Sequence, residues 1–139
     1  MRRGFMSIAA LLTVVLAACT PAAEPTPTVA DETALCTAFQ GVADANADFQ
    51  ALDPATASID DYQAAADAGA QALEDYLTLR GGEAADTELQ LRLTLNDLAT
   101  SLRQQPEGTT PEEAVDAVQP EIDAVQSALD TVGADLDCG

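Results

Sequence analysis

The sequence predicts an all-helical domain, arranged as a small up-down-up-down four-helix bundle. In four segments the apolar residues recur every three or four positions, which is the spacing of one face of a helix. Residues that start or stop helices stand between the segments, and the connections are short, as in antiparallel bundles. A three-helix bundle with the first segment as an extra N-terminal helix is the alternative. The segments span about 32–51, 59–80, 88–105 and 111–136.

The first two segments carry regular apolar stripes. We expect the first to end before Asp53, because this residue precedes a proline and such residues avoid the helical conformation. Ser58 and Asp61 fit a cap for the second segment, and Gly81 fits its stop. The expected core positions are Leu35, Phe39, Val42 and Phe49 in the first segment, and Ile59, Tyr62, Ala66, Gly69, Leu73 and Tyr76 in the second.

The third segment fits two kinds of secondary structure. Its leucines alternate over 89–95 as in a β-strand, but they also form a helical stripe. Leucine favours helices over strands, and the chain contains no second strand-like run to pair with this one. We therefore predict a helix that starts near Glu88, with Thr87 and Gln90 as a capping box, and that ends before Pro106. Its stripe consists of Leu91, Leu95, Leu98 and Leu102.

The fourth segment has the clearest start. Thr110 fits the cap position, Pro111 the first helical position and Glu113 the third. Pro120 interrupts the pattern, because proline removes one backbone hydrogen bond of a helix. The spacing leaves open whether the chain bends or breaks there. The apolar stripe consists of Val115, Val118, Ile122, Val125, Leu129, Val132 and Leu136.

The first 18 residues have the pattern of a secretory leader. Two arginines precede an apolar run, Ser7–Ala18, that is too short for the roughly 20 residues of a membrane-spanning helix. At its end, Leu16-Ala17-Ala18-Cys19 resembles the lipobox of bacterial lipoproteins. The resemblance implies cleavage before Cys19, a diacylglycerol on its thiol, and a membrane-anchored protein on the extracytoplasmic side. If the cell has two membranes, the sequence leaves open which of them holds the anchor, with the outer membrane as one option. A soluble secreted protein with an ordinary signal peptide is the alternative.

These observations divide the chain into three parts. Residues 1–18 are the lipoprotein signal peptide. Residues 19–31 are the lipidated cysteine and a tether rich in proline, alanine and threonine, a composition that favours extended and unpacked chain. Residues 32–139 are the acidic helical domain.

Two further cysteines remain for the folded domain. Cys36 stands near the start of the first predicted helix, and Cys138 is the penultimate residue. An up-down-up-down bundle places these two ends side by side, and an extracytoplasmic compartment permits disulfides. The chain has no CxxC motif and no histidine, so a redox or metal pair is the weaker interpretation. We predict a structural disulfide between Cys36 and Cys138.

Charge and residue usage exclude several classes of function. From Cys19 onward, three arginines stand against 24 acidic residues, a net charge of −21, and this field repels nucleic acids and anionic lipid headgroups. The chain has no histidine and no lysine, so the usual bases and activated nucleophiles of enzymes are absent. We therefore predict a protein without enzymatic activity or cofactor, whose acidic surface suits a basic protein partner.

Two acidic patterns match cation sites in part. Asp44, Asn46 and Asp48 fit the first half of a calcium-binding loop, but Phe49 and Ala55 stand where that loop needs glycine and glutamate. We assign no metal ligand there. Acidic residues also recur every seven positions in the second and fourth segments. If these helices are neighbours, the two rows border one acidic groove that suits divalent cations, whereas the simpler interpretation is two solvated faces. The rows are Asp60, Asp67 and Glu74, and Asp116, Asp123, Asp130 and Asp137.

Taken together, the sequence predicts a non-enzymatic binding or structural module, anchored to the membrane through Cys19 at the cell envelope. A low-affinity Ca²⁺-binding acidic domain is the alternative. A carbohydrate-active enzyme is disfavoured, because the part after Cys19 has only two phenylalanines and two tyrosines for stacking on sugars. The sequence identifies neither the partner nor the oligomeric state.

Overall fold

The computed structural model describes residues 31–136 and 138, and within these residues it contains five helices and no strand. They are α1 (Glu32–Ala51), α2 (Ile59–Arg80), α3 (Asp86–Arg103), α4 (Pro111–Ala117) and α5 (Gln119–Asp135). The predicted all-helical class is confirmed, with five helices where the sequence predicted four helical segments. The predicted signal peptide, the lipidated Cys19 and all but the last residue of the tether lie outside the described residues.

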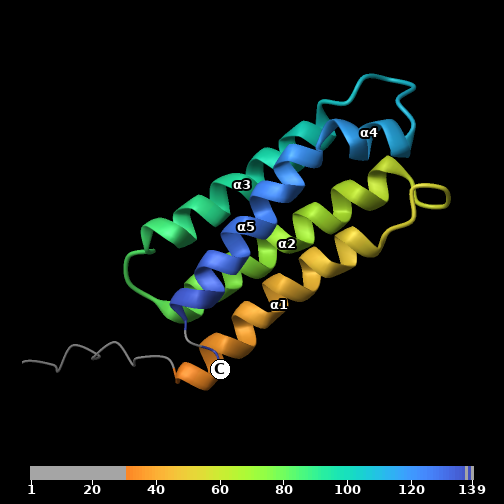
Figure 1. The fold of residues 1–139 in the computed structure, drawn as a ribbon. Coiled ribbons are helices and arrows are strands. Elements are labelled where there is room, and N and C mark those ends of the chain that lie inside the picture. The colour runs from red at the N-terminus through yellow and green to blue at the C-terminus, as the bar shows by residue number, and fades with distance from the viewer. Residues whose placement is uncertain (1–30, 137, 139) are drawn as a thin grey trace, which may run out of the picture.

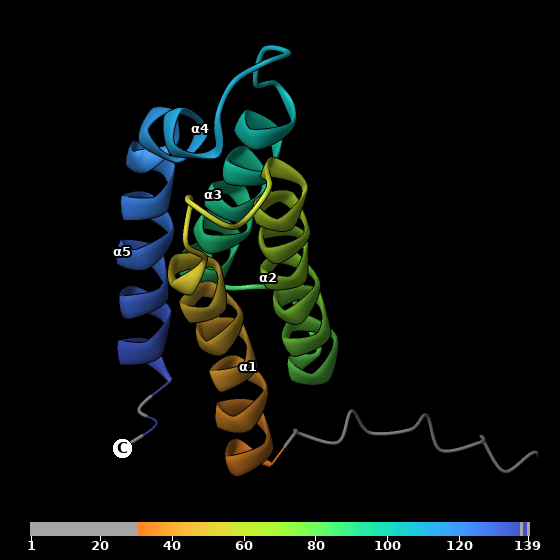
Figure 2. The same ribbon diagram turned by 90° about the vertical axis from the view of Figure 1, so that its right-hand side faces the viewer.

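The four long helices lie side by side, and α4 lies at one end of them (Figures 1 and 2). α1 packs most extensively against α2, α2 also packs against α3, and α3 packs against α5. α1 and α5 face each other with far fewer contacts, along a line that we call the α1–α5 seam. α1 therefore lies alongside α2 and takes part in the same bundle.

The bounds of α1 and α2 equal those predicted. Asp31 caps α1 by accepting a hydrogen bond from the backbone of Thr33. Ser58 and Asp61 form a reciprocal capping box at the start of α2, which lowers the pKa of Asp61 through the hydrogen bonds from the Ser58 backbone and hydroxyl. Gly81 ends α2 at a φ of 67°, a conformation that side chains rarely adopt.

The predicted start of the third helix is wrong by two residues. α3 begins at Asp86, and the carboxylate of Glu88 accepts a hydrogen bond of 2.7 Å from the backbone N–H of Ala85. Thr87 is therefore inside the helix, and its hydroxyl donates to Asp135 of α5 instead of capping. The leucine stripe predicted for a helix is buried, while Leu89 and Leu93 are exposed, so the helical interpretation of this segment is confirmed.

The fourth predicted helix is broken, which answers the question raised by Pro120. Thr110 and Glu113 cap α4 as predicted, and the hydrogen bonds from Thr110 lower the pKa of Glu113. At Val118 the backbone leaves the helical conformation, with a φ of −102° and a ψ of 11°. Pro120 then occupies the first turn of α5, where a proline costs no internal hydrogen bond.

The core lies between the four long helices. Two edge-to-face aromatic pairs join α1 to α2, Phe39 with Tyr76 at 5.6 Å and Phe49 with Tyr62 at 5.4 Å between ring centroids. α3 and α5 add mainly leucine and valine side chains. Among the described helices, none is both long enough and apolar enough to cross a membrane.

Candidate functional site

A groove runs along the α1–α5 seam, where the two helices are less closely packed than their neighbours. Its volume is about 550 Å³. Gly133 of α5 faces the Phe39 ring, and a Cβ atom there would lie 3.4 Å from the ring, in close contact with it. We call this hollow the α1–α5 groove, and it is lined by Phe39, Gln40, Ala43, Asp44, Asn46, Ala47, Gln50, Gln126, Leu129, Asp130 and Gly133.

Side-chain amides bridge the groove from one helix to the other. Asn46 Nδ2 and Gln50 Nε2, both on α1, donate to Gln126 Oε1 on α5, at 3.1 and 3.2 Å. Gln126 Nε2 in turn donates to Asp130 Oδ1 at 2.9 Å. Asn46 is only 6% exposed, so its amide needs these partners. The seam is thus held in its middle by polar contacts in place of apolar packing.

The predicted disulfide lies at one end of this seam. Cys36 of α1 is bonded to Cys138, with the two Cα atoms 5.7 Å apart. A second hollow beside the bond shares Gln40 and Asp44 with the α1–α5 groove and extends it toward Glu32, where α1 begins. The disulfide therefore fixes the α1–α5 seam at the end where this second hollow lies.

Charge is distributed unevenly around the domain. The three arginines of the described residues all belong to α2 and α3, and each pairs with an acidic residue of these two helices. The pairs are Arg80 with Glu88, Arg92 with Glu74, and Arg103 with Asp67. α1, α4 and α5 contain acidic residues and neither arginine nor lysine. The carboxylates of α1 and α5 around the α1–α5 groove therefore have no arginine or lysine on these two helices to neutralise them.

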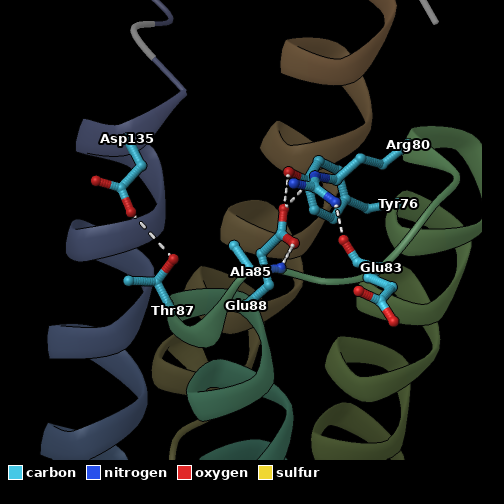
Figure 3. A network of polar contacts seen from close by, with 7 residues as sticks. All are labelled: Tyr76, Arg80, Glu83, Ala85, Thr87, Glu88 and Asp135. Atoms are coloured by element: carbon cyan, nitrogen blue, oxygen red, sulfur yellow. Dashed lines mark hydrogen bonds and ion pairs between the residues drawn. The ribbon is translucent and has the colours of Figure 1, made fainter. Parts of the chain in front are cut away.

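A buried carboxylate organises the turn between α2 and α3 (Figure 3). Glu88, which is 3% exposed, accepts hydrogen bonds from the Tyr76 hydroxyl at 2.6 Å and from the Ala85 backbone at 2.7 Å. Arg80 Nε lies 2.8 Å from the same carboxylate, and Arg80 also donates to the Glu83 carbonyl. Both carboxylate oxygens are satisfied within this cluster, so it fixes the turn and offers no free group for chemistry.

The pKa of Tyr76 is raised far above its ordinary range. Burial is the main cause, since a buried phenolate loses its hydration. The hydrogen bond that Tyr76 donates to Glu88 is the second cause, because it requires the protonated phenol. Tyr76 therefore stays neutral and acts as a donor to the buried carboxylate.

The two acidic rows noted in the sequence do not come together in a shared groove for cations. α2 packs against α1 and α3, while α5 packs against α3, so the two acidic rows lie on helices that are not packed neighbours. On α2, Asp67 and Glu74 are engaged by arginines of α3; on α5, Asp123 and Asp130 accept from glutamines one turn earlier. Asp137 lies outside the described residues.

The partial calcium motif belongs to the continuous helix α1, where Asp44 and Asp48 are exposed but Asn46 is buried, so a fully solvated helix face is not what the structure shows. Asp44 lines the α1–α5 groove, and Asn46 is buried beside Gln126. Within residues 31–136 and 138, no three histidine, cysteine or acidic side chains are grouped as metal ligands would be.

The burial of two residues in these polar clusters, Asn46 and Glu88, was not predicted from the sequence. Asn46 continues the stripe of Leu35, Phe39, Val42 and Phe49 at the same spacing, so its burial could have been predicted. The burial of Glu88 depends on a neighbouring helix and has no local signal in the sequence.

The comparisons add no relative to this description. Neither protein-family models, nor curated proteins, nor solved structures give a match to the chain.

Proposed function

We propose that the protein is a lipid-anchored, extracytoplasmic binding module without enzymatic activity, and that its α1–α5 face holds a basic protein partner at the cell envelope. One observation carries this proposal: every arginine of the described residues is paired on α2 and α3, while the helices around the groove carry only negative charge. A concave surface with uncompensated charge of one sign attracts a partner of the opposite sign.

The anchor is the part of the proposal that rests on sequence. Residues 16–19 fit a lipobox, and two acyl chains on Cys19 suffice for stable membrane attachment, whereas one chain binds only marginally. Residues 20–31 then supply a tether. A tether suits an acidic domain, since direct contact with anionic headgroups is unfavourable.

The topology belongs to the same proposal. We interpret α1, α2, α3 and α5 as an up-down-up-down four-helix bundle, with α4 as a short additional helix produced by the break at Val118. The short connections from α1 to α2 and from α2 to α3 support this interpretation, while the connection from α3 to α5 is longer and contains α4. In such a bundle the first and last helices are neighbours, which is where the groove lies.

The cation-binding alternative has lost its main support, because the two acidic rows do not meet. The α1–α5 groove contains two carboxylates, Asp44 and Asp130, among amide and apolar side chains. Oxygen-rich sites for Ca²⁺ use six to eight ligands. The arrangement is better suited to a protein surface than to a metal ion.

The anchor is tested by fractionating cells that express the full chain or its Cys19→Ala variant. We expect the unaltered chain in the membrane fraction, labelled by a radioactive fatty acid, and the variant unlabelled and released from the membrane. Equal membrane association of both proteins would contradict the anchor.

The binding face is tested by site-specific photocrosslinking on the same cells. A crosslinking residue replaces Gln50 at the groove or, as the control, Gln71 on the exposed side of α2. We expect a partner with a basic surface to be captured from position 50 and not from position 71. Capture of the same proteins from both positions would contradict a specific face.

A further inference from the structure

We infer that the α1–α5 groove recognises an arginine side chain of its partner. This inference rests on the function proposed above and specifies the group that the site binds. Three features of the groove support this inference: the hydrogen bonds that its amide groups already make, the positions of its two carboxylates, and its apolar floor.

Each amide of the groove uses one of its two N–H groups for a bond within the groove. Asn46 and Gln50 donate to Gln126, Gln126 donates to Asp130 at 2.9 Å, and Gln40 donates to Asp44 at 2.9 Å. Each of these carboxylates accepts through Oδ1, and no other side chain of the described residues donates to its Oδ2. The lining therefore offers more acceptors than donors to a ligand, which calls for a donor-rich group.

Arginine matches this lining better than lysine does. Its guanidinium has five N–H donors and no acceptor, in a planar fork that can serve acceptors on both sides of a groove. Asp44 stands on α1 and Asp130 on α5, so one acidic side chain lies on each wall. Lysine offers a single strongly hydrated ammonium. The apolar floor formed by Phe39 and Leu129 suits the face and the aliphatic stem of arginine.

A second copy of this chain is a poor occupant. Its three described arginines are each engaged in an ion pair on α2 and α3, and binding would require one of these pairs to break. The rest of its surface is acidic and repels the groove. Arg2 and Arg3 belong to the leader that the proposed processing removes, so the arginine comes from another protein.

The test uses the oxidised full chain and a short labelled peptide with two arginines flanking a leucine. Fluorescence anisotropy at constant ionic strength measures its dissociation constant, and the same peptide with two lysines is the comparison probe. We expect the arginine peptide to bind several-fold more tightly than the lysine peptide, because only the guanidinium can engage both walls. Equal binding of the two peptides, or no saturable binding of either, would overturn the inference.

A matched pair of variants locates the binding. Asp44→Asn with Asp130→Asn removes both carboxylates of the groove. Asp75→Asn with Asp123→Asn removes the same charge from outside it, and each of those aspartates also accepts at 2.9 Å from a glutamine four residues earlier. We expect a loss of about tenfold in affinity for the groove variant and less than about twofold for the control. Equal losses would show that net charge alone governs binding and would overturn the inference.

The failure of this inference is separable from failure of the proposed function. Partner capture from position 50 on cells, with no preference for arginine in the peptide assay, would overturn arginine recognition and leave the binding module in place. Self-association of the full chain that the groove variant abolishes, measured by light scattering, would replace the arginine partner with a second copy and overturn the inference.

Discussion

The α2–α3 and α1–α5 seams join neighbouring long helices by different means. α2 and α3 are adjacent in sequence, and their seam has three ion pairs and the buried carboxylate of Glu88. α1 and α5 are far apart in sequence, and their seam has a hollow, an amide bridge and a disulfide. One seam uses its charged groups internally, and the other leaves them facing solvent.

The difference shows how a small domain can keep one face available for binding. Close packing would fill the α1–α5 groove with side chains, while the disulfide holds the two helices together without filling it. A covalent link between residues separated by 102 positions also restricts the unfolded chain strongly. The bond thus supplies stability that the sparse packing of this seam does not.

The largest expected effect comes from removing this bond. Replacing both Cys36 and Cys138 with serine should lower the free energy of unfolding by about 4.7 kcal/mol, the value that the chain-entropy model gives for a loop of this length. The loss should be local first, because α1 keeps its contacts with α2 while α5 keeps its contacts with α3. Urea unfolding followed by circular dichroism measures the energy.

Hydrogen exchange shows where the loss occurs. Amides at the start of α1 and the end of α5 should exchange faster in the serine variant, while those of the α2–α3 seam should keep their protection relative to the global stability. Amides at the two helix ends that lose no more protection than the global loss of stability would contradict the idea that the disulfide mainly closes one seam.

The second largest effect is expected in the α2–α3 seam. Replacing Glu88 with alanine leaves the Tyr76 hydroxyl without its acceptor and Arg80 without its ion pair, at a cost of about 3 kcal/mol. Urea unfolding measures this loss. Glu88→Gln keeps the shape and an acceptor oxygen, so it should cost clearly less than alanine. If alanine and glutamine cost the same small amount, the carboxylate does not organise this turn.

These two seams also separate what the sequence could predict from what it could not. The bounds of α1 and α2 followed from local signals: a proline after the first helix, and Ser58, Asp61 and Gly81 around the second. The pairing of Cys36 with Cys138 followed from the expected topology. Local signals were sufficient for these two helices, whose caps depend on neighbouring residues of the chain alone.

The sequence was less informative where partners from other helices decide. Thr87 matched a capping box, but α3 starts earlier because Glu88 caps Ala85 while it is also held by Tyr76 and Arg80. The α1–α5 groove depends on how far apart two distant helices stand, which no spacing within one helix determines. The acidic rows are periodic in the sequence, but their periodicity could not show that α2 and α5 are not packed neighbours.

A smaller effect is expected from alkaline pH, and it should act through the α2–α3 seam. The pKa of Tyr76 is raised in the folded state by burial and by the bond to Glu88, whereas in the unfolded state it returns to about 10. Below pH 10 both states are protonated and this group adds no pH dependence. Above pH 10 the unfolded state loses a proton that the folded state keeps, so stability falls, by about 1.4 kcal/mol for each pH unit within this window.

Urea midpoints between pH 8 and pH 11 measure this slope. Tyr76→Phe should lower stability at pH 8 and flatten the decline above about pH 10. Tyr62 is the control, because its pKa is also raised by burial and by Asp53, but its hydroxyl donates to the backbone carbonyl of Leu52 instead of a carboxylate. We expect Tyr62→Phe to flatten the decline less. A slope that neither substitution changes would exclude tyrosine ionisation as its cause.

The smallest expected effects compare the polar contacts of the two seams directly. Gln126→Ala deprives Asn46, which is 6% exposed, of its partner across the α1–α5 seam and should cost about 1 kcal/mol. Arg103→Gln removes an ion pair of the α2–α3 side whose two side chains are about half exposed, and it should cost less than about 0.5 kcal/mol.

Added salt should reduce the effect of the arginine substitution and leave that of Gln126 unchanged, because screening acts on exposed charges and not on a neutral amide pair. The same urea unfolding, at low and high sodium chloride, measures both. A larger, salt-insensitive loss for Arg103→Gln would mean that the exposed ion pairs, and not the buried groups beneath them, hold the α2–α3 seam together.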